Sequence, residues 1–239
     1  RFTFFYDSAV VRRPPADPAA LLAWIRAHPG RFTYPQPPQF HGTSFLKQLL
    51  LAMHAQRAAF QQPVGANFDS LTQPLWQWLD AAHPQLWRRG RVFPASGPAQ
   101  RRLLSDGEVD WAMGFNSAEA SRAIASGEFA ATVRSLRFSA GALSNSHFVA
   151  IPVNARAREA AMVVGNFLVS PAAQARKADE RHWGDATVLA VGRLPPPQRA
   201  LFTRLKPGPA TLPPTGPVLD EPHPSWMIGL EREWARRYR

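Results

Sequence analysis

Residues 103–123, LLSDGEVDWAMGFNSAEASRA, predict a helix end, a buried strand, a turn and a new helix in quick succession. Asp106 and Gly107 supply the helix stop, because glycine tolerates the positive φ of a helix C-terminus. The run 109–113 is apolar except for Asp110, too short for an independent helix and suited to a strand of an α/β sheet. Gly114 ends this strand, and the stretch as a whole predicts an α/β fold class.

A turn of three residues, Phe115, Asn116 and Ser117, separates this strand from a helix expected over 118–125. Asn116 or Ser117 caps the helix, and Asn116 with Glu119 has the spacing of a capping box. The first backbone N–H groups of a helix are unpaired, and open α/β sheets bind ligands at the carboxyl ends of their strands. The turn is therefore a candidate binding element.

A second candidate lies in the proline-rich loop 35–44, PQPPQFHGTS, which ends in small and hydroxyl residues. It follows a short strand expected at 31–34 and precedes a helix expected over 45–59. Gly42, Thr43 and Ser44 thus lie at a helix N-terminus. Plain helix capping explains these residues as well as a ligand cradle of N–H and hydroxyl groups does.

Elsewhere the apolar spacing and the turn residues predict alternating strands and helices. Further strands are expected at 2–6, 91–93, 132–138 and 147–152. Further helices are expected over 18–27, 68–86, 156–169 and 225–238, with another that starts at Pro171. The alternation over residues 8–126 predicts a mostly parallel sheet with right-handed crossovers. Residues 193–224 hold ten of the 24 prolines and are expected to be extended.

Composition places the chain among globular proteins. Its 239 residues are 45% hydrophobic, enough for one large or two modest domains with a real core. The absence of cysteine excludes disulfides and thiolate chemistry. No apolar run approaches the roughly 18 residues needed to span a bilayer. The chain opens with Arg1, so we expect a processed or truncated product.

The net charge of +11 raises the possibility of nucleic-acid binding, but its distribution disfavours that function. Of the 28 basic residues only three are lysine, and the arginines occur as scattered pairs. No basic segment is interleaved with aromatic residues in the manner of single-strand binders. An anionic ligand remains compatible with the charge.

The motifs of common enzyme classes are absent. The sequence contains no G-x-G-x-x-G, Walker A, G-x-S-x-G or H-E-x-x-H pattern, and its seven histidines show no metal-ligand spacing. No nucleophile and base can be paired, so we expect no catalytic residue, metal or cofactor. An α/β hydrolase or transferase acting on a small anionic substrate is the alternative reading.

Several stretches together resemble an extracytoplasmic substrate-binding protein of an ABC importer. NFLVSPAAQ at 166–174 and LSDGEVDWAM at 104–113 resemble segments of that superfamily. More narrowly, NSHFVAIPVN at 145–154, FTYPQPP at 32–38 with Gly42, and the pattern KADxxxWG at 177–184 resemble the YnjB-like group. That group comprises proposed substrate-binding components related to thiamine-type importers. The likeness runs over nearly the whole chain.

The resemblance implies a type II periplasmic-binding fold, with two α/β lobes joined by hinge strands. Residues 1–7 would be the first hinge strand and 8–144 a complete lobe two. Residues 145–239 would be the second hinge strand and the C-terminal part of lobe one, whose first part is expected to be missing. The implied function is capture of a small solute, thiamine-like or anionic, in the periplasm and its delivery to permease subunits in the membrane. A monomer that binds no nucleic acid is expected.

The resemblance also brings the two candidate turns to one cleft between the lobes. Gly42 and Ser117 would offer backbone N–H groups, and Phe115 a flat apolar contact. Thr43, Ser44 and Asn116 would offer side-chain hydrogen bonds. Asn145, Ser146 and His147 would form the cleft floor, where the chain crosses again. Tyr6 and Tyr34 are weaker candidates for stacking on the solute.

Overall fold

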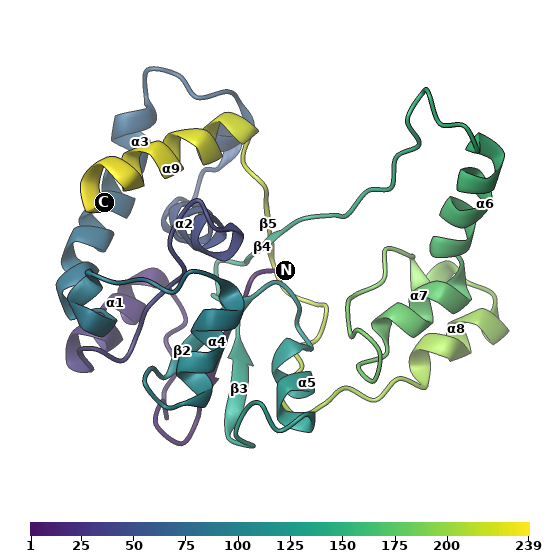
Figure 1. The fold of residues 1–239 in the computed structure, drawn as a ribbon, viewed down its shortest axis with the longest axis horizontal. Helices are drawn as coiled ribbons and strands as arrows, with labels where there is room; N and C mark the ends of the chain where they lie inside the picture. Colours follow the sequence, from purple (N-terminus) through teal and green to yellow (C-terminus); the bar gives the residue numbers. More distant parts are fainter.

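A body and a projecting arm make up the computed structural model, which describes residues 1–239 (Figure 1). The body consists of residues 1–144 and 210–239, and the arm of residues 145–209. Two extended segments connect them, one leaving the body after β4 (Ala142–Ser144) and one returning before β5 (Val218–Asp220). None of the helices combines the length and apolarity that crossing a bilayer requires.

The central sheet of the body has the strand order β2-β1-β3. β1 (Thr3–Asp7) is antiparallel to both β2 (Trp111–Gly114) and β3 (Val133–Leu136), with Phe4 opposite Met113 and Leu136. The mostly parallel sheet predicted for residues 8–126 is wrong, because β2 is the one strand that forms there and it pairs antiparallel with β1. β4 and β5 form a separate parallel pair.

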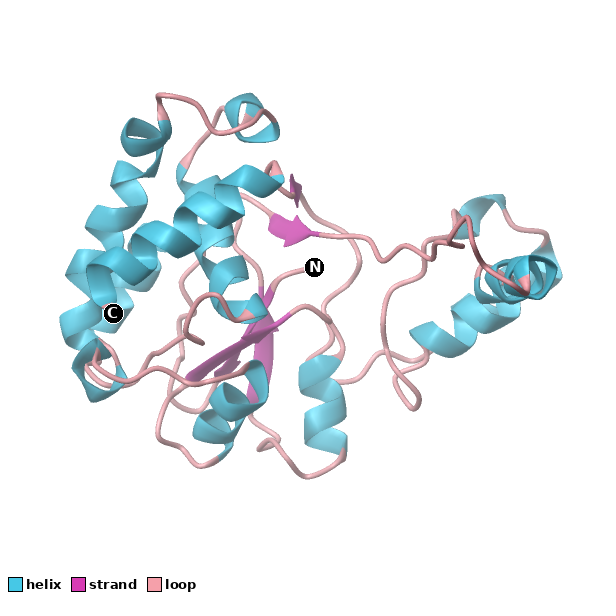
Figure 2. Ribbon diagram, turned by 45° about the horizontal axis from the view of Figure 1, so that its top comes forward, coloured by secondary structure: helices cyan, strands magenta, loops and turns pink.

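Helices cover both faces of the central sheet (Figure 2). Successive residues of β1 point to opposite faces, so Phe4 joins a core of 27 buried residues and Phe5 a smaller core of nine. The larger core lies beneath α1 (Pro18–Ala27), α2 (Phe40–Met53), α3 (Phe68–Ala82) and α9 (Pro224–Tyr238). The smaller core lies beneath α4 (Gly97–Ser105) and α5 (Glu119–Ala125).

The stretch 103–123 folds as its sequence predicts. α4 ends at Ser105, Gly107 has a φ of +70°, β2 follows, and α5 begins after the turn. The predicted strands at 31–34 and 91–93 are absent. The buried carbonyls of residues 32–33 accept their hydrogen bonds from groups outside any sheet. Trp87 N donates to Phe32 O (2.8 Å), and Gln100 Nε2 donates to Thr33 O (2.7 Å).

The C-terminal helix α9 packs against α2, in the body. Its predicted apolar stripe is confirmed, with Trp226, Leu230 and Trp234 buried in the larger core. The resemblance places this helix in the other lobe with the rest of 145–239, but it lies in the body, because its apolar stripe completes the core there. The lobe boundaries otherwise stay a prediction.

The arm holds α6 (Arg158–Leu168), α7 (Pro171–Ala178) and α8 (Pro196–Thr203). α8 corrects the expectation of an extended chain there, because its prolines occupy the first turn, where a missing N–H costs nothing. The strand expected at 147–152 is also wrong. No strand lies beside this segment to accept its hydrogen bonds, and Phe148 is 89% exposed.

We predict that Tyr34→Phe destabilises the body. The Tyr34 hydroxyl lies 2.7 Å from His83 Nε2 and accepts a hydrogen bond from Trp234 Nε1 (2.7 Å), all in the interior. Its removal leaves buried polar groups unpaired, so the free energy of unfolding in urea should fall by about 1–3 kcal/mol. Tyr6→Phe is the control, since the half-buried Tyr6 packs on Trp111 through its ring. Equal stability of the two variants would contradict the prediction.

Candidate functional site

The turn 115–117 joins the end of β2 to the start of α5. Asn116 Oδ1 accepts a hydrogen bond from Ala118 N (2.9 Å), but Ala118 is itself the N-cap residue and no side chain caps α5, so the predicted cap by Asn116 or Ser117 is wrong. The capping box does not close, because the Glu119 carboxylate pairs with Arg101 instead. Burial raises the pKa of Glu119, and Arg101 opposes that rise. A side chain at Gly114 would collide with Glu119, since a Cβ there would lie 2.1 Å from Glu119 Oε2.

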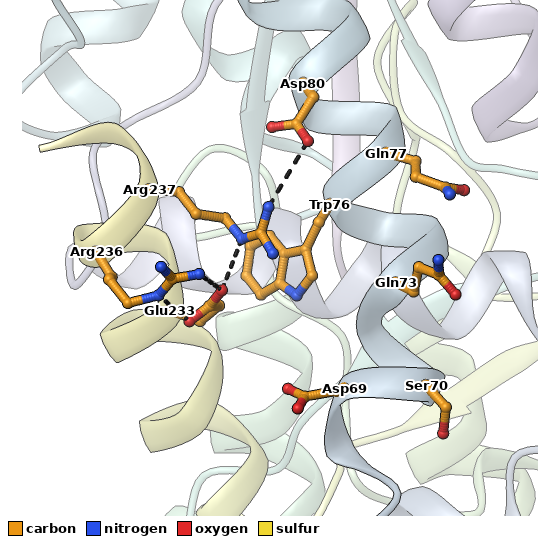
Figure 3. A pocket seen from close by; sticks show the side chains of 9 residues that line it. All are labelled: Asp69, Ser70, Gln73, Trp76, Gln77, Asp80, Glu233, Arg236 and Arg237. Atoms are coloured by element: carbon orange, nitrogen blue, oxygen red, sulfur yellow. Dashed lines mark hydrogen bonds and ion pairs between the residues drawn. The ribbon is translucent and has the colours of Figure 1, made fainter.

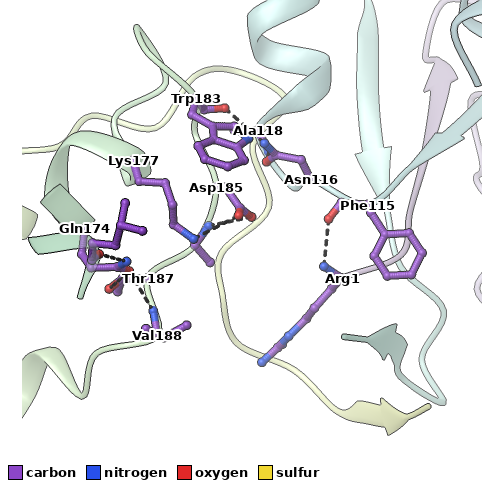
Figure 4. Close-up of polar contacts among 12 residues, drawn as sticks. Arg1, Phe115, Asn116, Ala118, Gln174, Lys177, Trp183, Asp185, Thr187 and Val188 are labelled. Carbon is purple, nitrogen blue, oxygen red and sulfur yellow. Dashed lines mark hydrogen bonds and ion pairs between the residues drawn. The ribbon is translucent and has the colours of Figure 1, made fainter. Parts of the chain in front are cut away.

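The same turn contacts the arm (Figure 4). Asn116 Nδ2 donates to the carbonyl of Trp183 (3.1 Å), which also accepts from Arg122 Nη1 (3.0 Å). Gly184 has a φ of +75°, and a Cβ on it would lie 2.7 Å from the Cβ of Ala118. The glycine of the pattern KADxxxWG therefore has a structural reason: it passes too close to Ala118, just before α5, to carry a side chain.

Two further contacts hold the arm and its return segment against α5. The Glu180 carboxylate accepts from Gly208 N (3.1 Å) and from Thr211 Oγ1 (2.7 Å). Ser121 Oγ of α5 accepts from Ala210 N (3.0 Å). The start of α5 is thus the place where the arm and its return segment are fixed to the body.

Polar and aromatic groups from both parts face one another around this contact (Figure 4). On the arm, Lys177 Nζ lies 3.1 Å from Asp185 Oδ2 and 5.6 Å from the centre of the Trp183 ring, which is 49% exposed. On the body, the half-buried Phe115 accepts a hydrogen bond at its carbonyl from Arg1 N (2.9 Å). An amide, an indole face and one charge of each sign can orient a small polar solute with a planar part.

The start of α2 lies beside this turn, since the Phe40 and Phe115 rings are 5.0 Å apart between centroids. Its predicted donors are nevertheless occupied or buried. Gly42 N donates to Gln39 Oε1 (3.3 Å), and Thr43 Oγ1 donates to Glu231 Oε1 (2.6 Å). Capping and packing, not a cradle, therefore explain this turn.

Three details account for that correction. Gln39 caps the helix, so α2 begins at Phe40 and encloses residues 42–44 in its first turn. Ser44 is fully buried. A Cβ on Gly42 would lie 2.0 Å from Pro35 O, so this glycine is required by packing. The exposed residue at the helix start is Phe40, which is 48% accessible and is not among the predicted site residues.

The remaining predicted residues are dispersed. Asn145, Ser146 and His147 begin the extended segment toward the arm, with Ser146 and His147 exposed. Tyr34 is contradicted as a stacking residue, because it is fully buried and its hydroxyl serves the core. Tyr6 lies opposite Trp111, whereas Thr3 lies opposite Gly114, so Tyr6 is at the far end of β1 from the turn. Their role in binding, apart from that of Tyr34, stays a prediction.

A surface groove of about 740 Å³ between α3 and α9 is a poor alternative site (Figure 3). All its charged groups except Asp69 are paired: Glu233 pairs with Arg236 (2.6 Å) and Arg237 (2.7 Å), which hold the pKa of Glu233 at about 2, and Arg237 also pairs with Asp80 (3.7 Å). Arg237 also stacks on Trp76, 5.3 Å from the ring centre. None of the predicted site residues lines this groove.

The mixed α/β fold and the polar groups at the start of α5 are compatible with the binding of a small solute. The structure contains no cluster of side chains able to hold a metal ion. The sequence pattern of the bacterial extracellular solute-binding proteins matches residues 1–190, and the chain belongs to this family. Its members are solute-binding proteins and not enzymes.

Two comparisons agree with that family. The chain is 47% identical over 240 residues to Protein YnjB of Escherichia coli (strain K12), covering 100% of this chain and 60% of that protein. Its fold is similar to that of a periplasmic thiamin binding protein, with a TM-score of 0.51, 18% identity, and coverage of 100% of this chain and 62% of the other. The chain thus spans about three-fifths of the length of both proteins.

We predict that Gly184→Ala loosens the arm from α5. The positive φ costs a non-glycine residue about 1–2 kcal/mol, and the new methyl group would press on Ala118. Local opening should therefore increase about 5- to 30-fold, measured as the rate of trypsin cleavage between residues 177 and 185. Gly192→Ala is the matched control in the same arm, because a Cβ there meets nothing within 4 Å. Identical cleavage of both variants would refute the contact.

Proposed function

We propose that this protein is the substrate-binding component of an ABC importer. A small solute is captured between the turn 115–117 of the body and residues 177–187 of the arm, and is delivered to permease subunits in the membrane. The proposal is supported by the family and carried by one observation, the hydrogen bond from Asn116 to the Trp183 carbonyl, which brings the turn and the arm together. The proposed location is the periplasm, and the proposed state is a monomer.

Magnitudes explain why a solute needs both sides. Micromolar affinity requires about 8 kcal/mol. A neutral hydrogen bond contributes roughly 0.5–1.5 kcal/mol, and a helix N-terminus adds about 0.3–1 kcal/mol for an anion. The turn alone therefore falls short, and burial against Trp183 and its neighbours in the arm supplies the remainder. Closure of the arm over the solute gives the permease a distinct shape to recognise.

Two classes of solute are compatible with these groups. The name of the periplasmic thiamin binding protein points to a thiamine-like solute, and the indole face of Trp183 with the Asp185 carboxylate suits a planar cation. Lys177 and the N–H groups at the start of α5 suit an anion instead. The enzyme alternative is not favoured, because the family consists of solute-binding proteins.

The test is a thermal-shift screen of the full-length protein against thiamine, related heterocycles and small organic anions, followed by calorimetry on the best solute. Asn116→Ala removes the amide that the turn offers and its bond to Trp183, so affinity should fall about tenfold, equal to about 1.4 kcal/mol. Asn67→Ala is the control, because the exposed Asn67 side chain makes no capping bond at the start of α3.

A binding protein does not convert its solute, so we also expect the solute to be recovered unchanged after incubation. The proposal is supported if one solute stabilises the protein without being converted, and if binding of that solute weakens in Asn116→Ala but not in Asn67→Ala. A solute that binds both variants equally would exclude the turn as the binding element, and conversion of the solute to a product would favour the enzyme alternative.

A further inference from the structure

A cavity of about 280 Å³ lies between the end of β3 and the return segment from the arm. Ser135, Arg137 and Ser139 line it from one side, and Thr215 and Gly216 from the other. Its lining contains no carboxylate, although it contains an arginine. Because a water molecule occupies about 30 Å³ in the liquid, this volume is ample for a small oxyanion.

Two guanidinium groups meet at this segment without a counter-ion. Arg1 Nη1 donates to the carbonyls of Thr215 and Gly216 (both 3.3 Å), and Arg137 Nη1 donates to that of Pro213 (2.8 Å). Neither arginine forms an ion pair with a carboxylate, unlike Arg31, Arg101 and Arg237. Burial and the nearby Arg1 lower the pKa of Arg137, which reflects this uncompensated charge.

Two buried donors here also lack partners. Arg137 Nε and Ser135 Oγ are both inaccessible to solvent and make no hydrogen bond. Both residues line the cavity, Ser135 from β3 and Arg137 from the residue after its end. An unpaired buried donor costs about 1–3 kcal/mol, and more when it is charged, so an acceptor in the cavity would be stabilising.

We propose that this cavity is an oxyanion site, with Arg137 and Ser135 as its donors and Arg1 as a second source of positive charge. The ligand chemistry is a phosphate or carboxylate group, which a guanidinium binds through geometrically matched hydrogen bonds. Such a group is either a free anion or the acidic part of the transported solute. The second source rests on the proposed function, and Arg1 connects the two places because its backbone N bonds to Phe115 O (2.9 Å).

Calorimetric titration of the full-length protein with inorganic phosphate at low salt tests the site. Arg137→Gln should weaken phosphate binding at least tenfold, and Ser135→Ala a few-fold. Arg134→Gln is the matched control on the same strand, because Arg134 Nη1 donates only to nearby carbonyls of residues 131 and 133. It also corrects for non-specific attraction to a chain of net charge +11. Melting curves establish that each variant is folded.

Loss in Arg137→Gln or, if that variant does not fold, in Ser135→Ala, with Arg134→Gln unaffected, supports the site. Equal binding by all variants, or no phosphate binding by the wild type, overturns it. If Arg137→Gln also weakens the binding of a solute that carries an acidic group, the anion is part of the solute. If Arg137→Gln weakens the binding of phosphate alone, the ligand is a free anion. If Asn116→Ala binds every solute as tightly as the wild type does, the proposed function is wrong, and the phosphate result is not affected.

Discussion

The arrangement of body and arm depends on a small set of hydrogen bonds at the start of α5, first among them the bond between the Asn116 amide and the Trp183 carbonyl. The oxygen of the same side chain accepts a hydrogen bond from Ala118 N, so one residue links the turn before α5 to the arm. This double use is possible because β2 ends at Gly114 and because Gly184 leaves room for Ala118.

The body, in contrast, is held together by many contacts between residues far apart in the chain. Tyr34 accepts from Trp234, and Thr43 donates to Glu231, so α9 is fixed to the first helices of the chain. The arm has no comparable core, and α6 contains no buried residue. Its fixed points are the few bonds near α5. Because the arm is attached to the body only near α5, a solute bound at that contact would affect the position of the arm more than it affects the body.

Local signals in the sequence predicted local structure well. Gly107 and Gly114 act within a few residues of themselves, so the helix end, the strand and the new helix of residues 103–123 are predicted correctly, whereas the side-chain cap is not. Contacts between distant residues were not accessible in this way: the sequence does not reveal that β1 lies between β2 and β3, or that Trp183 meets Asn116. Tyr34 shows the limit, because the partners that bury it are 49 and 200 residues away.

Hydrogen–deuterium exchange with and without the bound solute tests most directly that the solute is held between body and arm. The account predicts that residues 115–122 and 177–187 gain protection together, at the same solute concentration, while α3 on the opposite side of the body is unchanged. Protection confined to one of the two segments, or centred on the groove between α3 and α9, would contradict it.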